Sequence, residues 1–316
     1  MSAAVALLVY SVLLSTLGPR LLRARHWAER APWLGVLAWQ AAVASVIGGM
    51  VLAELMLAVP IVRAPHGLSD LLAACRIMLR VHYEGAPQPV AGYAGLLVAG
   101  GILLWISAHV LTTFVTIAVR RRRHARTLTM VARRRRDLEA LVVEYDQPLA
   151  YCLPGRPHYV VVSTGVLDRL EDEQVSAVLA HERAHLAGRH DLAINIAIAV
   201  GRAFPAVPLL RAAKTEIPRL LEMRADDVAA REHDRVTLAA ALVTVAEGRA
   251  PTMALGAGGG TALLRVRRLL APHNPLTRIE RLTGSVGIAM FVTLPLALAA
   301  NPAVTALLER HCHFPV

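Results

Sequence analysis

Two histidines in the stretch AVLAHERAHLAGRHD, residues 177–191, stand four residues apart with a glutamate directly after the first. In an α-helix, residues four apart share one face, so His181 and His185 can aim imidazole nitrogens at one metal ion. Glu182 can then reach a water bound to that ion and take its proton as the water attacks a peptide carbonyl. This HExxH spacing predicts two zinc ligands and a general base, and it leaves a third ligand to be found.

A second helical stretch, RLLEMRADDVAARE at residues 219–232, offers the missing ligand. Glu222 and Asp226 are four residues apart and share a helix face. We predict that Glu222 is the third zinc ligand and that Asp226 orients a ligand imidazole. The alternative is a solvated helix face on which both acids pair with nearby arginines. The HExxH motif upstream favours the metal site.

The residues around HExxH predict a helix that ends at Gly188. Three acidic residues, 171–173, open the stretch LEDEQVSAVLAHERAHLAG, where they favour the positive end of a helix dipole. Val175, Val178 and Leu179 form a stripe that faces a core, and a glycine is a common helix terminator. His181 and His185 lie on the same broad side, so the metal is expected inside the domain.

The composition is typical of a membrane protein. Of the 316 residues, 55% are hydrophobic and only 4% are aromatic, and the mean hydropathy is +0.48. A helix needs about 20 apolar residues to cross a bilayer. Four stretches meet that need, at about residues 2–18, 33–59, 93–119 and 284–300.

These stretches predict a mainly α, multi-pass membrane protein with a zincin-like α+β catalytic domain. Residues 1–119 would form three transmembrane helices with an extracytoplasmic loop at about 60–92. Residues 120–282 would form the HExxH domain, and 283–316 the fourth transmembrane helix and a short tail. Arginines concentrate after the first and third spans, which places those loops and the catalytic domain in the cytoplasm and both termini outside.

The net charge of +11 comes largely from arginine runs such as RRRRHARTLTMVARRRRD, residues 120–137. We interpret this run as a stop-transfer signal and an anchor for lipid headgroups. Because no aromatic residues interleave it, as a base-stacking surface would need, we expect no direct nucleic-acid partner.

The three cysteines are not spaced like a metal or redox pair. On the predicted topology Cys75 and Cys312 share the oxidising side of the membrane, whereas Cys152 is cytoplasmic. Whether Cys75 and Cys312 form a disulfide or remain free thiols is open.

At this point the sequence resembles a known family. YCLPGRPHYVVVSTGVLDRLEDEQVSAVLAHERAHLAGRHD followed by EMRADDVAA looks like the BlaR/MecR group of integral-membrane zinc metalloproteases, peptidase family M56, which is related to the HtpX-type membrane proteases. The resemblance is close over residues 151–230 and extends loosely to the four-span layout. It implies Zn²⁺ ligands at His181, His185 and Glu222, a general base at Glu182 and a supporting acid at Asp226.

Four further expectations concern the surroundings of the site. HYVVVST, residues 158–164, resembles the edge strand against which such enzymes lay an extended substrate. PHNPLTRIERL, residues 272–282, resembles a stretch of the HtpX-type branch, in which His273 or Arg278 could steady the oxyanion. Residues 192–210 are apolar, but a single crossing would separate the zinc ligands, so we expect a buried or interfacial helix. GAGGG, residues 256–260, reads as a flexible linker.

The predicted function is a membrane zinc endopeptidase that acts on a protein or peptide substrate at the lipid bilayer. By resemblance, the substrate would be a cytoplasmic transcriptional repressor, or the protein itself, cleaved in response to a signal. Only about 16 residues follow the last span, so we do not expect the β-lactam-sensing domain of the penicillin-responsive members. Two alternatives stay open: an HtpX-like quality-control protease and an inactive signalling scaffold.

Overall fold

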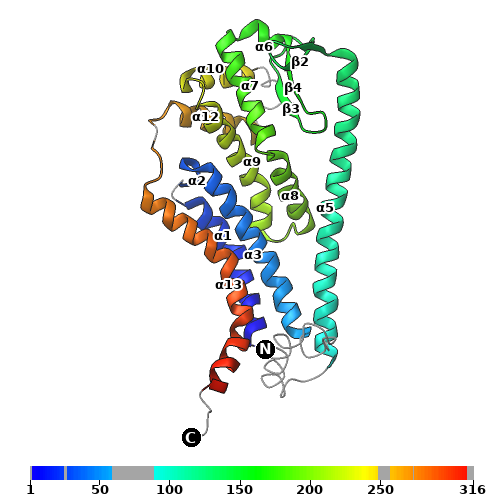
Figure 1. Ribbon diagram of the computed structural model, residues 1–316, viewed down its shortest axis with the longest axis vertical. Coiled ribbons are helices and arrows are strands. Elements are labelled where there is room, and N and C mark those ends of the chain that lie inside the picture. The colour runs from blue at the N-terminus through cyan, green and yellow to red at the C-terminus, as the bar shows by residue number, and fades with distance from the viewer. Residues whose placement is uncertain (1, 25–26, 59–88, 248–256, 273, 312–316) are drawn as a thin grey trace.

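The computed structural model describes residues 2–24, 27–58, 89–247, 257–272 and 274–311, and it is mainly helical (Figure 1). Several expectations fall outside these ranges: the loop with Cys75, His273 and Cys312. The elements are α1 (Ser2–Arg23), α2 (Trp27–Arg30), α3 (Pro32–Ala58), α5 (Pro89–Val131), β1 (Arg133–Arg135), β2 (Ala140–Val143), β3 (Ala150–Leu153), β4 (Tyr159–Ser163), α6 (Thr164–Arg169), α7 (Asp172–Ala187), α8 (His190–Ala203), α9 (Pro208–Ala229), α10 (Arg235–Glu247), α12 (Ala257–Leu270) and α13 (Arg278–His311).

Among the residues that the structure describes, four helices are long and apolar enough to cross a membrane, as the sequence predicts. They lie in α1, α3, α5 and α13, and they pack as a bundle at one end of the molecule, with the sheet at the other (Figure 1). The first residue of α1 and the last turns of α13 lie at the end of the bundle that is far from the sheet (Figure 1).

Helix α5 continues without a break through the predicted boundary at residue 119. Its 43 residues make it about 65 Å long, whereas the hydrocarbon core of a bilayer is about 30 Å thick. The polar continuation runs alongside the HExxH domain and ends directly before β1 (Figure 1). The third span and the domain therefore share one rigid helix.

The sheet has four short strands in the order β1-β2-β4-β3. β2 pairs with β4 in parallel, and β1 and β3 are antiparallel to their neighbours. The prediction that residues 158–164 form an edge strand is wrong, because β4 has a hydrogen-bonded strand on both sides. The outer strand beside α7 is β3, Ala150–Leu153. The apolar pattern of HYVVVST does not indicate that this other strand lies at the edge.

The two faces of the sheet are covered by different helices. Leu141, Leu153 and Val161 pack against Leu128 on the continuation of α5. The alternate strand positions, with Val160 and Val162 among them, face a core shared with α6, α7 and α10. Successive residues of a strand point to opposite faces, so the run VVV of β4 is buried on both sides.

Helices α8 and α9 form a hairpin that packs among the spans. Its core joins Trp39 and Val46 of α3 to Leu209, Ile217 and other apolar residues of α9. Residues 192–210 have a buried face and an exposed one, which fits the predicted buried or interfacial helix. They form two helices rather than one, because the chain turns at 204–207. The Trp105 indole donates a hydrogen bond of 2.9 Å to the carbonyl of Ala203, which places the end of α8 beside the middle of the third span.

Helix α12 follows α10 and packs against it. The prediction of a flexible linker at 256–260 is wrong for residues 257–260, which form the first turn of α12; Gly256 lies outside the described residues. The interface with α10 and α9 supplies the tertiary contacts that override the low helix propensity of glycine.

Candidate metal centre

The HExxH motif lies in the last two turns of α7, as the sequence predicts. Glu171 caps the helix in a reciprocal arrangement with Gln174, in which each side chain accepts from the other residue's backbone N–H. The helix ends at Ala187, with Gly188 as its C-cap. His181 and His185 are both buried, and Glu182 is half-buried.

Three possible ligand atoms converge between α7 and α9. The Nε2 atoms of His181 and His185 are 3.2 Å apart. The Glu222 carboxylate lies 3.6 Å from Nε2 of His181 and 3.4 Å from Nε2 of His185. Within the described ranges, this trio is the only group of His, Cys, Asp and Glu residues placed to hold a metal ion.

The spacing fits zinc. Zn–N and Zn–O bonds of about 2.0–2.1 Å in a tetrahedron place neighbouring ligand atoms about 3.3 Å apart. The two histidine nitrogens are 3.2 Å apart, close to that value. The two carboxylate oxygens of Glu222 each approach one of them, Oε1 to His185 at 3.4 Å and Oε2 to His181 at 3.6 Å, and one ligand atom from each residue lies within 4.8 Å of the others. Two imidazoles and one carboxylate also form the donor set of catalytic zinc sites that keep a fourth position for water.

Asp226 supports His181 from the side away from the ligand atoms. Its Oδ1 lies 3.0 Å from Nδ1 of His181, a buried nitrogen that forms no hydrogen bond among the described residues. The side chain of Asp226 is fully buried. A carboxylate at this position orients a ligand imidazole and raises its basicity, which is the role predicted for Asp226.

Arg265 of α12 completes the cluster, and the sequence analysis missed it. Its guanidinium makes two hydrogen bonds to Asp226, of 2.7 and 2.8 Å, and one of 2.8 Å to Glu222. A weaker contact of 3.4 Å reaches Nε2 of His181. Helix periodicity could have indicated Arg265, because it is four residues before the buried Leu269 and therefore lies on the same inward face of the helix.

The charges in this cluster depend on one another. Burial raises the pKa of Glu222, but His181 and Arg265 outweigh it and bring that pKa to about 2. Burial likewise raises the pKa of Asp226, yet Arg265 and His181 hold it well below its usual range. Both carboxylates are therefore ionised at neutral pH, as a ligand and an orienting acid must be.

The two histidines differ. Burial lowers the pKa of His185 to about 4, so its ring is neutral at pH 7 and offers a lone pair. Burial also lowers the pKa of His181, but Asp226 and Glu222 outweigh this and raise it to about 9. Metal binding at Nε2 of His181 must therefore displace a proton.

His190 lies against the second histidine of the motif. Its Nδ1 is 3.1 Å from Nδ1 of His185, and the rings meet edge to face. Gly188 makes room for it, because a Cβ there would lie only about 2.4 Å from Nε2 of His190. A glycine stands at 188 because of this lack of space, not because of a left-handed φ, which falls on Arg189 instead.

The predicted base, Glu182, faces the outer strand. Burial, together with the negative charge of the Glu182 carboxylate, raises the pKa of the Cys152 thiol on β3 to about 12. Strand β3 therefore runs directly beside Glu182. Arg278 is exposed at the start of α13, and the structure does not bring it to the cluster.

A comparison with protein families finds a match to peptidase family M48 over residues 118–286, a little over half of the chain. The chain belongs to peptidase family M48. The match includes both helices of the candidate metal centre and identifies a metallopeptidase. With four membrane-spanning candidates, this M48 member is a membrane metalloprotease, and the relation to HtpX-type enzymes fits. No curated protein and no solved structure gives a significant match.

Proposed function

We propose that this M48 member is a membrane zinc endopeptidase with His181, His185 and Glu222 as the metal ligands. The observation that carries the proposal is the convergence of two imidazole nitrogens, 3.2 Å apart, and the Glu222 carboxylate, within 3.4–3.6 Å of them, on the helix that carries Glu182. When bound, zinc lowers the pKa of a coordinated water to about 7. An inactive scaffold would have no need for this complete set of donors.

The protein side chains divide the remaining work. The carboxylate of Glu182 takes a proton from the attacking water and delivers it to the nitrogen of the departing amine. Asp226 holds the imidazole of His181 in its ligating orientation through Nδ1. Arg265 holds Asp226 in turn.

Strand β3 is the proposed platform for the substrate. It is one of the two outer strands of the sheet, so one of its edges has no strand partner among the described residues. An extended polypeptide can pair with such an edge through backbone hydrogen bonds, which hold it without demanding a particular sequence. The contact between Cys152 and Glu182 would place its backbone close to the base.

The substrate class we propose is a protein presented at the membrane surface, as for HtpX-type enzymes, because the family match supports that relation. Cleavage of a cytoplasmic repressor after a signal, as the BlaR/MecR resemblance implies, is the alternative. We further propose that the catalytic domain spans residues 120–282 and faces the cytoplasm.

Bound zinc per chain tests the proposal in the purified full-length protein, together with cleavage of an unstructured protein such as casein. We expect close to one zinc in the wild type and in Glu182→Gln, and far less in Glu222→Ala. Cleavage should be lost in both variants and on chelation. A folded wild-type protein that takes up no zinc after supplementation would contradict the proposal.

A further inference from the structure

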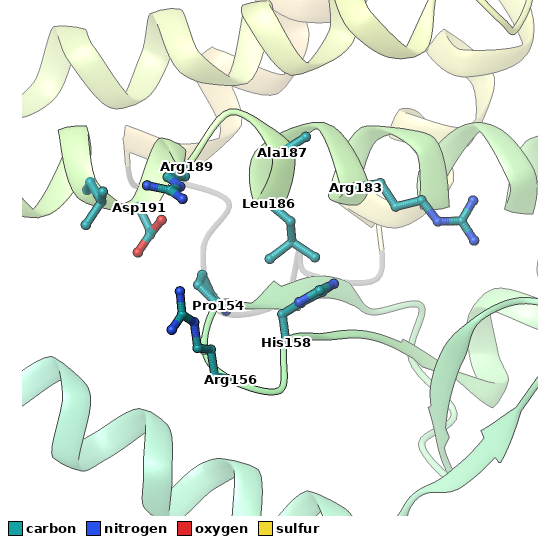
Figure 2. A pocket seen from close by; sticks show the side chains of 10 residues that line it. Pro154, Arg156, His158, Arg183, Leu186, Ala187, Arg189 and Asp191 are labelled. Atoms are coloured by element: carbon teal, nitrogen blue, oxygen red, sulfur yellow. The ribbon is translucent and has the colours of Figure 1, made fainter.

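A basic cleft lies beside the HExxH helix, on the side away from the candidate metal centre. It separates the loop between β3 and β4 from the turn between α7 and α8, and it has a volume of about 590 Å³. Figure 2 shows Arg156 of the loop pointing up toward Asp191 and Arg189 of the turn. An adjoining cleft of about 540 Å³ shares Arg156 and Asp191 and extends to α5.

Arginines from four separate elements line the joined clefts. They are Arg121, Arg122 and Arg126 of α5, Arg156 of the loop, Arg189 of the turn, and Arg183 of α7, which pairs with Glu139 at 3.4 Å. The one acid that lines both clefts, Asp191, forms a 2.9 Å ion pair with Arg121. In the described part of the chain the other four arginines have no carboxylate partner. The clefts therefore carry uncompensated positive charge that suits an anion.

Arg189 stands at an unusual position for its residue type. Its φ of 47° and ψ of 40° lie in the left-handed region, which favours glycine over residues with a Cβ. The glycine of this turn is the preceding residue, Gly188. An arginine at a left-handed position suggests that its side chain has a use there, and that side chain lines the cleft.

The lower boundary of the clefts is apolar. Ala118, in the last turn of the predicted third span, lines the cleft at α5, and Leu192, 40% exposed, lines the other. Ile196, one turn further along α8 and 45% exposed, continues the same face. Helix α8 then ends at Ala203, beside Trp105 in the middle of that span.

The arginines lie toward the sheet, and the exposed aliphatic side chains lie toward the spans. This arrangement suits an amphiphilic ligand with a charged head and an apolar tail. A soluble acidic peptide would account for the arginines but not for Leu192 and Ile196. A phospholipid accounts for both, because its phosphate lies where the apolar part of a span ends, and its acyl chains lie below that level.

We propose that the joined clefts bind the phosphate headgroup of an anionic phospholipid through Arg156, Arg189 and the α5 arginines, with an acyl chain along Leu192 and Ile196. The site is separate from the metal centre, and its test needs no peptidase activity.

Lipid binding to the full-length protein in detergent, followed by native mass spectrometry, tests the proposal. Phosphatidylglycerol is the anionic probe and phosphatidylcholine the zwitterionic one. We expect wild type to retain phosphatidylglycerol preferentially, and the double variant Arg156→Gln/Arg189→Asn to bind it roughly tenfold more weakly or worse. Asparagine tolerates the left-handed turn, so the variant is expected to fold, which thermal unfolding checks.

The matched control is Arg169→Gln/Arg231→Asn, which removes the same charge from exposed positions on α6 and just beyond α9. It should bind phosphatidylglycerol as wild type does. Equal binding by the double variant and wild type would overturn the proposal. So would full displacement of the lipid by inorganic phosphate or by poly-glutamate at comparable concentration, since either would show that the site recognises charge alone.

Discussion

Arg265 is the residue on which the geometry of the metal centre depends most. Asp226 is fully buried and ionised, and its two hydrogen bonds come from this one guanidinium. A buried carboxylate that loses its partner is costly, by about 3–5 kcal/mol. Arg265 therefore both stabilises α9 against α12 and fixes the acid that orients His181.

Replacing Arg265 with alanine is expected to destabilise the protein by about 3–5 kcal/mol and to weaken zinc binding about 10–100-fold. Arg265→Lys should restore stability in part but not the geometry, because an ammonium cannot form the two-pronged contact with Asp226. Chelator competition measures zinc affinity, and thermal unfolding measures stability. Arg267→Ala, an exposed arginine of the same helix, is the control and should change neither.

Cys152 is expected to react slowly with thiol reagents. Its pKa of about 12 leaves roughly one thiol in ten thousand ionised at pH 8, whereas an unperturbed cysteine is about a quarter ionised. Since the pKa is raised, labelling should accelerate as the pH rises toward 12. Iodoacetamide labelling resolved by peptide mass spectrometry measures it.

The Glu182→Gln variant tests how much the charge of Glu182 contributes to the raised pKa of Cys152. It removes the negative charge beside the thiol, so Cys152 should label several-fold faster at pH 8 but remain slower than in the denatured protein, because burial is the larger cause. Rapid labelling of native wild type at pH 8 would show that the thiol is not buried as described, and equal labelling of wild type and Glu182→Gln would show that the Glu182 charge does not act on it.

At the scale of residues, the sequence predicted the site residues that lie together on one helix. The i, i+4 spacing of His181 and His185, and of Glu222 and Asp226, follows from helix periodicity alone. Arg265 and Cys152 could not be found in that way. They come from α12 and β3, 43 residues after Glu222 and 30 before Glu182, and only tertiary packing brings them to the site.

At the scale of elements, helix α9 connects the bundle to the metal centre, and it packs closely against the spans where they carry glycine. A Cβ on Gly35 of α3 would lie 2.8 Å from Cβ of Ala28 and 3.0 Å from Cδ1 of Leu220 on α9. Leu220 is fully buried and is two residues before Glu222. The spans can therefore approach α9 only because a hydrogen replaces a methyl group here.

Gly35→Ala is accordingly expected to destabilise the protein by about 1–3 kcal/mol, because the extra methyl overfills a packed contact. Gly100→Ala on α5 is the matched control, since a Cβ there has nothing within 4 Å, and it should be neutral or slightly stabilising. Thermal unfolding in the same detergent compares them. Equal melting temperatures would show that α2, α3 and α9 pack less closely than described.

The helices were predictable because caps and periodicity mark them, as for α7. The sheet was less so. Its strands are only three to five residues long, and which strand lies outermost depends on the crossover from β2 to β4, a pairing between residues 20 apart. An apolar strand such as HYVVVST is equally compatible with an inner and an outer position.

For the whole molecule, the catalytic segment is not packed as a separate body. Leu209, Leu220 and Met223 of α9 are fully buried in a core that they share with α1 and α3. A shortened protein of residues 120–282 would expose them. We expect it to aggregate or to lack stable helical structure and zinc, while the full chain in detergent retains both. Circular dichroism and zinc analysis compare the two, and a soluble, helical, zinc-binding fragment would contradict this expectation.

The number of spans was predictable from hydropathy. The shared core was not, because the apolar pattern of α9 is the same whether its apolar face contacts a span or the interior of a separate domain.

The path of α9 has one more consequence. Helix α9 begins among the spans and carries Glu222 and Asp226 in its last two turns. The position of a metal ligand is therefore tied to the tilt of α1 and α3. Bilayers of different thickness tilt their spans differently. The lipid chain length of the surrounding membrane should therefore act as a tuning variable for the zinc affinity of this protein, even when no lipid touches the metal centre.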